Sequence, residues 1–399
     1  MNRIIFYLLI SISIQLVAQP VLKKQLLADT LWQLVGTKGF SGDWVDWINM
    51  AISSDGTPFV AFINYNGSSF VPTVMKFKNG NWIDVGNQGF AVSGSYLSLA
   101  LSPSDIPYVA FTDYANSSRL SVMKFEGGNW ENVGNQGFSL DLAFWAKIAF
   151  NQSGTPYVAF QDHYYGSKLS VMKFNGTSWE YIGIPGFSTL LPTYLSFAFN
   201  PSSHPYVAYH DEGYGTKESV MKFDGTNWVY VGSPGFSSNS TQGTSLAFDQ
   251  SGQPYVAFGD ATYGSKGTVM RFDGTSWVFV GQPGFTIGRA TDISLAFSLD
   301  GLPYIAHSDL DNTNRETVMR FDGTNWVYVG NPGFSESEAY ESCLAFSPSG
   351  QPYVAYQDNA NSNKKISVMH YDILTDIDQQ YAQDVQIYPN PVQTELNIT

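Results

Sequence analysis

The chain has 399 residues, of which 43% are apolar and 16% aromatic, a composition that is typical of a globular protein and excludes extended disorder. Its 34 acidic residues against 20 basic ones give a formal net charge of −14, so neither nucleic acid nor an anionic membrane is expected as a partner. The single cysteine, Cys343, excludes an internal disulfide.

The chain begins with a segment typical of a secretory signal peptide. Arg3 precedes an apolar stretch from Ile4 to Val17, and the small residue Ala18 makes a cleavage point before Gln19. We therefore expect a signal peptide over residues 1–18 and a short lead-in over residues 19–30. Export without disulfides means that stability must come from packing.

A repeat of constant length follows. Each copy has an aromatic residue after a proline, and these aromatics are spaced 49 residues apart: Phe59, Tyr108, Tyr157, Tyr206, Tyr255, Tyr304 and Tyr353. Every copy but the last also contains four apolar runs of four to six residues, rich in Val, Tyr, Phe and Trp and bounded by Gly, Pro, Asn and Asp. Such runs are typical of strands, and four strands per unit at this period predict propeller blades. We predict an all-β, seven-bladed β-propeller over residues 31–372.

The ends of the array predict how the ring closes. The first six units each end in a Trp-containing outer strand. The last unit ends at Tyr371 without one, and an unpaired copy at Trp32 precedes the first unit. The N-terminal strand should therefore form the outer edge of the seventh blade, which leaves no long exposed edge.

The two faces of the predicted ring differ in how much they vary. With strands called A to D from the axis outward, the A–B and C–D turns are short and alike, as in Ser251–Pro254 and Asp273–Gly274. The D–A and B–C loops on the other face vary in sequence at nearly constant length. This variable loop face is predicted to be a recognition surface, and the alternative is drift in unused loops.

One position on the loop face suggests a ligand. Two residues before the polar start of each A strand, successive blades have Trp47, Tyr96, Trp145, Tyr194, Gly243, Asp292 and Glu341. Aromatic faces beside carboxylates suit a sugar ring, and Lys147, where other blades have Ser, Asn or Cys, adds a donor. We predict that the six non-glycine residues and Lys147 bind carbohydrate. The alternative is that the aromatics only plug the channel.

Two charged series recur on the same face, and we expect both to serve the blades. The acidic series, which begins with asparagine, is Asn64, Asp113, Asp162, Asp211, Asp260, Asp309 and Asp358; the basic series is Arg119, Lys168, Lys217, Lys266, Arg315 and Lys364. The aspartates should accept backbone N–H groups, as in WD-repeat propellers, with the bases as partners. Calcium on these aspartates is the alternative, but they lack a closely spaced oxygen set, so no metal and no cofactor is expected.

No motif of nucleophilic, phosphate-binding or zinc chemistry is present. Phe272–Trp277 resembles the Asp-box turn of sialidase-type propellers but departs from its spacing, and no arginine triad accompanies it. Asp292 and Glu341, on neighbouring blades, leave glycoside hydrolysis by paired carboxylates open. Cys343 stands where other blades have serine and is expected to be a small core residue.

After a polar linker over residues 373–384, residues 385–399 contain Tyr388-Pro389-Asn390-Pro391. This segment resembles the start of the C-terminal sorting domain of type IX secretion in Bacteroidota-type bacteria, and the propeller resembles secreted bacterial repeat proteins. The resemblance implies the type IX secretion machinery as a partner, a secreted or cell-surface location and a sorting domain that continues beyond Thr399.

Together these observations predict an exported, monomeric, non-catalytic binding module that recognises carbohydrate through its loop face, with no catalytic residues. Two alternatives remain: a glycan-cleaving hydrolase or lyase on the same scaffold, and a surface component that binds a protein ligand or serves a structural role.

Overall fold

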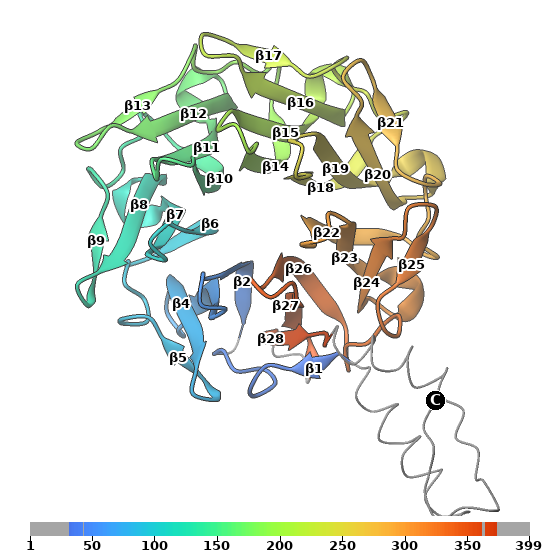
Figure 1. The fold of residues 1–399 in the computed structure, drawn as a ribbon. Coiled ribbons are helices and arrows are strands. Elements are labelled where there is room, and N and C mark those ends of the chain that lie inside the picture. Colours follow the sequence, from blue (N-terminus) through green and yellow to red (C-terminus); the bar gives the residue numbers. More distant parts are fainter. Residues whose placement is uncertain (1–31, 43, 361–363, 373–399) are drawn as a thin grey trace, which may run out of the picture.

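The computed structural model describes residues 32–42, 44–360 and 364–372. These residues form seven four-stranded antiparallel sheets around a central axis, which confirms the predicted seven-bladed β-propeller (Figure 1). The predicted signal peptide, lead-in, linker and sorting segment lie outside the described residues. Within those residues, no helix has the length and apolar character needed to span a membrane.

The first three blades are meanders of consecutive strands, A to D. Blade 1 contains β2 (Val45–Ile52), β3 (Pro58–Tyr65), β4 (Phe70–Lys78) and β5 (Asn81–Asp84). Blade 2 contains β6 (Gly94–Leu101), β7 (Pro107–Asp113), β8 (Arg119–Glu126) and β9 (Asn129–Asn132). Blade 3 contains β10 (Ala143–Phe150), β11 (Pro156–Asp162), β12 (Lys168–Phe174) and β13 (Trp179–Tyr181).

Blades 4 to 6 repeat this pattern, and blade 7 takes its outer strand from the start of the chain. Blade 4 contains β14 (Pro192–Phe199), β15 (Pro205–Asp211), β16 (Lys217–Phe223) and β17 (Trp228–Tyr230). Blade 5 contains β18 (Thr241–Phe248), β19 (Pro254–Asp260), β20 (Lys266–Phe272) and β21 (Trp277–Phe279). Blade 6 contains β22 (Ala290–Phe297), β23 (Pro303–Asp309), β24 (Arg315–Phe321) and β25 (Trp326–Tyr328). Blade 7 contains β26 (Ala339–Phe346), β27 (Pro352–Asp358), β28 (Lys365–His370) and β1 (Gln33–Leu34).

The closure of the ring agrees with the prediction from the unpaired Trp32 segment. Strand β1 pairs antiparallel with β28, with Gln33 opposite His370 and Leu34 opposite Met369. The next residue continues the contact, because the Val35 N–H donates to the Val368 carbonyl at 2.8 Å. The seventh blade is thus completed by the other end of the chain.

A tryptophan in each D strand ties that blade to the preceding one. In all seven blades of the described chain, the indole N–H donates to a backbone carbonyl of the preceding D segment at 2.7–3.0 Å. Each indole also stacks on a phenylalanine, with ring centroids 4.1–4.8 Å apart. A glycine follows each D strand where these rings meet: at Gly36, whose φ is 75°, an added Cβ would lie 2.7 Å from the Phe77 ring. The repeated tryptophans therefore hold neighbouring blades together.

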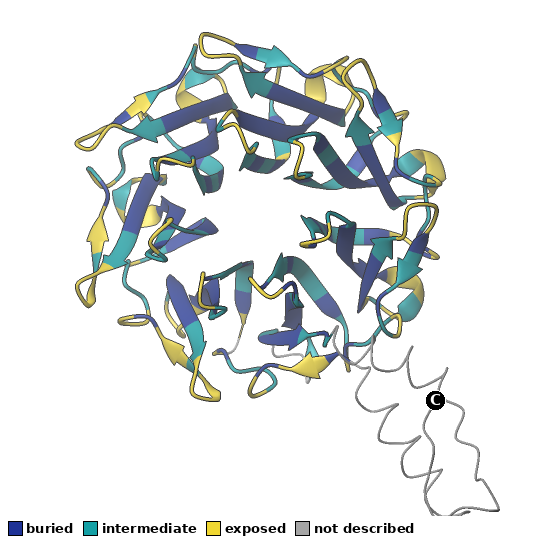
Figure 2. Ribbon diagram, viewed as in Figure 1, coloured by how far each residue is buried: buried dark blue, intermediate teal, exposed yellow. Residues whose placement is uncertain are grey.

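The hydrophobic core lies between blades rather than within each sheet. Figure 2 shows the middle strands of the blades buried and the turns and outer strands exposed. One cluster joins Val45, Ile48 and Phe62 of blade 1 to Ile366 and Val368 of blade 7. Because each sheet buries its faces against its neighbours, stability belongs to the closed ring.

Buried aspartates end the B strands, and in four of the five short 3₁₀ turns that follow, the aspartate side chain caps the turn; Asp162, before η2, makes no cap bond. Those turns are η1 (Tyr114–Asn116), η2 (His163–Tyr165), η3 (Glu212–Tyr214), η4 (Ala261–Tyr263) and η5 (Leu310–Asn312). Five aspartates accept the backbone N–H two residues ahead at 2.8–3.2 Å, which agrees with the expected structural role.

The basic series lies opposite these aspartates in the B–C ladder, as in the pair Asp113 and Arg119. In blade 7 the residue opposite Asp358 is Lys365, so the assignment of Lys364 to this series was wrong, because the B–C loop there is one residue longer than in blades 2 to 6. No group of three or more His, Cys, Asp or Glu side chains suited to a metal ion occurs among the described residues.

Candidate functional site

Seven equivalent β-bulges direct one residue of each blade towards the axis. In every A strand the pairing with the B strand shifts at the position singled out in the sequence. The residue there has a left-handed backbone with φ between 50° and 64°: Trp47, Tyr96, Trp145, Tyr194, Gly243, Asp292 and Glu341. Only glycine adopts this conformation without strain. Six blades hold larger side chains there, each at a cost of about 1–3 kcal/mol, and such strain concentrates at functional sites.

Four of these side chains form a continuous aromatic arc. The ring centroids of Trp47 and Tyr96 are 4.2 Å apart, those of Tyr96 and Trp145 5.2 Å, and those of Trp145 and Tyr194 5.7 Å. Trp47 also meets Trp145 edge-on at 5.6 Å. The rings thus support one another, as the plug alternative requires, but Tyr194 keeps 44% of its surface exposed.

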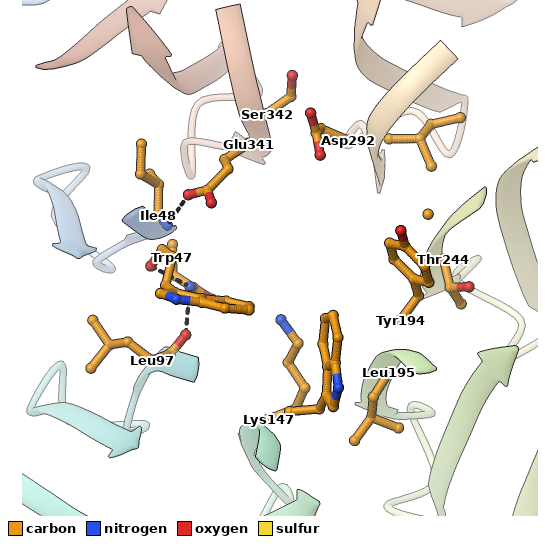
Figure 3. Close-up of a pocket in the computed structure, with 14 residues that line it drawn as sticks. Trp47, Ile48, Leu97, Lys147, Tyr194, Leu195, Thr244, Asp292, Glu341 and Ser342 are labelled. Carbon is orange, nitrogen blue, oxygen red and sulfur yellow. Dashed lines mark hydrogen bonds between the residues drawn. The ribbon is translucent and has the colours of Figure 1, made fainter. Parts of the chain in front are cut away.

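A central pocket of about 310 Å³ lies at this end of the axis. All seven A strands contribute to its wall. Six of the seven predicted residues line it, together with Gly243: Trp47, Trp145, Lys147, Tyr194, Asp292 and Glu341. Tyr96 is outside the lining and packs against Trp47 and Trp145. Figure 3 shows Trp47, Lys147 and Tyr194 directed towards the same space as Asp292 and Glu341, which face them from the other side. The structure therefore brings the predicted set together, with Tyr96 as a supporting ring.

Lys147 interrupts a structural pattern that most other blades keep. Two residues after the bulge, Ser98, Ser196, Ser245 and Ser294 each accept the backbone N–H of the next A strand at 2.9–3.1 Å. Cys343 does the same for the Met50 N–H at 3.3 Å, so it substitutes for serine, as expected. An ammonium group has no acceptor. Blade 3 therefore gives up this link and presents a cation to the pocket instead.

Desolvation and charge act on Lys147 in opposite directions. Burial lowers its pKa, and the nearby Cys343 and Glu341 act in the opposite direction. Lys147 is the only cationic side chain in the pocket lining. It is therefore the one group of the wall that could neutralise an anion.

The opposite wall holds an acidic arc, which we define as Asp46, Asp292 and Glu341. Burial raises the pKa of Glu341 well above its usual value, and a hydrogen bond with Asp46 and the charge of that residue raise it further. The Ile48 N–H donates to Glu341 Oε2 at 2.9 Å and fixes the carboxyl in place. Burial also raises the pKa of Asp292. Neighbouring carboxyls that cannot all ionise keep one proton in the arc.

Sequence reasoning missed Asp46. Its equivalents in the other blades are uncharged, and the residue is far from Glu341 in the sequence. The signal was available, because closure of the ring places blade 1 beside blade 7, so that the acid before the bulge of one blade faces the acid at the bulge of the other.

Two fully buried glutamates behind the pocket wall were also missed. Glu218 Oε2 accepts the hydroxyls of Thr241 at 3.1 Å and Thr244 at 3.2 Å, and Glu316 Oε2 accepts the Ser342 hydroxyl at 2.7 Å. Burial raises the pKa of each glutamate to about 8. Thr244 and Ser342 line the pocket, so these carboxyls set the direction in which the two hydroxyl hydrogens point.

No protein-family model matches this sequence, and no curated protein matches it. Several solved structures resemble its fold. An ulvan lyase of polysaccharide lyase family PL25, bound to -[GlcA(1-4)Rha3S]-, superimposes with a TM-score of 0.56 and 13% identity, covering 84% of this chain and 95% of that one. The polysaccharide lyase Uly1 gives a TM-score of 0.52 with 8% identity, covering 82% and 89%. A protein of unknown function from Dyadobacter fermentans DSM 18053 gives 0.50 with 11% identity, covering 85% and 97%.

At these identities the likeness establishes the fold alone. The comparison nevertheless contradicts the prediction of a non-catalytic binding module. Of the three structures above, the two with a stated activity are polysaccharide lyases. The comparison favours the alternative that the sequence left open. The physical reason for the error is that the repeat indicates an architecture and no activity, and that the contact of Asp46 with Glu341 depends on the closed ring.

Proposed function

We propose that this chain is a glycan-cleaving enzyme whose active site is the central pocket and whose proton donor is Glu341. The observation that carries the proposal is the acidic arc: a glutamate kept protonated by burial and by Asp46, with Asp292 on the adjacent blade, opposite aromatic rings. Glycoside hydrolysis needs one carboxyl that is protonated and one that is ionised. We assign the protonated role to Glu341, whose pKa is raised well above its usual value by burial and by Asp46, and the ionised role to Asp292.

The proposed reaction is hydrolysis of a glycosidic bond. Trp47, Trp145 and Tyr194 would hold the apolar faces of sugar rings. Glu341 would donate its proton to the glycosidic oxygen as the bond to the anomeric carbon breaks. Asp292 would either attack that carbon or remove a proton from the water that attacks it. The water supplies the hydroxyl group of the new reducing end. Its remaining proton goes to Glu341 where Asp292 is the nucleophile; where Asp292 is the base it takes that proton, and exchange with solvent then returns both carboxyls to their starting states.

The test compares isosteric variants on a panel of polysaccharides, with new reducing ends as the readout. Glu341→Gln and Asp292→Asn should each lower kcat by about 10²- to 10⁴-fold. A glutamine still accepts the Ile48 N–H, so the fold should persist. Glu336→Gln, on an exposed residue outside the pocket, is the control. Release of products by Glu341→Gln at the wild-type rate would contradict the proposal.

Eliminative cleavage is the second candidate, and Lys147 favours it. A lyase must neutralise a uronate carboxylate while a base removes the neighbouring proton and the C–O bond breaks. Lys147 is the one cation in the pocket lining, and the similar lyases share the fold. Elimination leaves an unsaturated sugar that absorbs ultraviolet light. Such absorbance from the wild type and its loss in Lys147→Ser, which installs the residue of four other blades, would identify a lyase.

Export belongs to the proposal as well. We infer secretion through type IX machinery to the medium or the cell surface, supported by the signal-peptide pattern of residues 1–18 and by the segment from Tyr388 to Pro391. Mass spectrometry of protein recovered outside the cell tests this inference. A mature N-terminus at Gln19 supports it, and an N-terminal Met1 on exported protein contradicts the cleavage site.

A further inference from the structure

The ring of bulge positions has one gap. Six blades place an aromatic or acidic side chain at the bulge, and blade 5 places Gly243 there, between Tyr194 of blade 4 and Asp292 of blade 6. Gly243 and the next residue, Thr244, both line the central pocket. The gap therefore opens the pocket wall between the aromatic arc and the acidic arc.

Neighbouring residues do not fill this gap. A Cβ built on Gly243 would meet Ile293 Cγ2 at 3.4 Å and the Asp292 N at 3.9 Å, which are ordinary contact distances. The φ of 64° at Gly243 is close to the 50° at Tyr96 and Tyr194. The same bulge holds a tyrosine in two blades, so the backbone of blade 5 does not by itself require glycine.

The floor of the gap offers hydrogen-bond acceptors. The Thr244 hydroxyl donates to Glu218 Oε2 inside the wall, which leaves its oxygen lone pairs for the pocket. The Ser342 hydroxyl donates to Glu316 in the same manner. Asp292 borders the gap with carboxylate oxygens. The buried His210 ring packs against Tyr194 of the same blade, with ring centroids 4.6 Å apart.

Glu218 and Glu316, which hold the two hydroxyl groups, are absent from most other blades. At the position of Glu218 and Glu316 in the B–C ladder, blades 2, 3 and 7 have the fully buried Leu120, Leu169 and Ile366. A carboxyl at this position is costly in a buried site. Both glutamates lie behind hydroxyls of the pocket wall, one of them at the gap.

From this geometry we propose that the Gly243 gap is a subsite for a sugar branch of the glycan, whose hydroxyl hydrogens bond to Thr244 and Asp292 while the backbone chain lies across the aromatic arc. This inference rests on the proposed function and narrows its substrate class to branched glycans. A tyrosine at position 243 would occupy the branch position, and the aromatic faces for the backbone chain would remain.

The experiment compares Gly243→Tyr with the wild type on matched oligosaccharide pairs: xylo-oligosaccharides with and without arabinose branches, cello-oligosaccharides with and without xylose branches, and manno-oligosaccharides with and without galactose branches. The wild type should bind or cleave the branched member of at least one pair about tenfold better, or more. Gly243→Tyr should abolish that preference by weakening the branched member alone. Gly243→Ala, which adds strain but little bulk, should keep it.

The outcomes separate the two proposals. Cleavage of linear members only, or an equal loss on both members in Gly243→Tyr, would overturn the branch subsite and leave the glycan-cleaving function standing. Thr244→Val, which keeps the shape and removes the acceptor, should also reduce the preference for branches, and an unchanged preference would count against the assigned bond. Absence of binding to every member would overturn both proposals.

Discussion

Replacing Glu218 and Glu316 together by leucine should make the protein more stable at alkaline pH, by about 4 kcal/mol for each residue at pH 8.5 relative to the difference at pH 5. Burial raises the pKa of each glutamate from 4.5 to about 8. Below pH 4.5 both carboxyls are protonated in the folded and unfolded protein, and no stability is lost. Between pH 4.5 and 8 the unfolded chain ionises these carboxyls while the folded protein keeps them protonated, so the wild type loses stability as the pH rises. Above pH 8 the folded carboxyls ionise as well, and the loss levels off.

Leucine is a conservative choice at these positions because Leu120 and Leu169 occupy them, fully buried, in other blades. The variant loses acceptors for the hydroxyls of Thr241, Thr244 and Ser342, at a cost of about 1 kcal/mol for each unsatisfied group. That cost does not depend on pH, whereas the gain from removing the carboxyls does.

The measurement is urea unfolding of the wild type and the double leucine variant between pH 5 and pH 8.5. Subtracting one unfolding free energy from the other removes the contributions of groups that titrate alike in both proteins. His210 lies 4.0 Å from Glu218, but burial lowers its pKa to about 4, so above pH 6.5 the ring is neutral in the folded and unfolded states. Glu131→Gln, on the exposed face of β9, controls for loss of a surface charge. A difference in unfolding free energy that stays constant across this pH range would contradict the prediction.

The repeat predicts the features of the fold that every blade shares. The period of the tyrosines predicted the fold, the number of blades and the strand that closes the ring, because each of these depends on local strand and turn chemistry repeated in every unit. The bulge positions were recognisable for the same reason. Their variation from Trp47 to Glu341 was visible against a constant scaffold, and the structure gathers six of the seven predicted side chains at one pocket.

The rest of the site depends on contacts between blades, which one repeat does not contain. Asp46 meets Glu341 only because the ring closes. Glu218 reaches Thr244 of the next blade. In both cases the informative signal is a departure from the repeat, an acid where the other blades have uncharged residues, but its meaning requires knowing which strands face each other across a blade boundary.

Deleting residues 19–36 should open the ring and destabilise the whole protein, by about 6 kcal/mol or more, an amount comparable with the stability of many domains. The deletion removes Trp32, which is 5% exposed, donates to the Val329 carbonyl at 2.8 Å and stacks on Phe334 at 4.6 Å. Loss of a buried tryptophan alone costs about 3–5 kcal/mol. It also removes Val35, whose carbonyl accepts the Trp82 indole at 2.7 Å, so blade 1 loses a partner too.

Single substitutions separate ring closure from simple loss of contacts. Trp228 of blade 4 makes the same interactions with the preceding blade, with a bond to the Ile182 carbonyl at 3.0 Å and a stack on Phe187 at 4.4 Å, but its strand is joined to its own blade by the C–D turn. Trp32 lies on the one outer strand that only non-covalent contacts hold in its sheet. Trp32→Ala should therefore lower the melting temperature more than Trp228→Ala does. A synthetic peptide of residues 31–42, added to the deletion variant, should restore stability as its concentration rises. Equal losses in the two substitutions would contradict a special role of Trp32 in closing the ring. An unchanged melting temperature in the deletion would mean that the ring stays closed without its N-terminal strand.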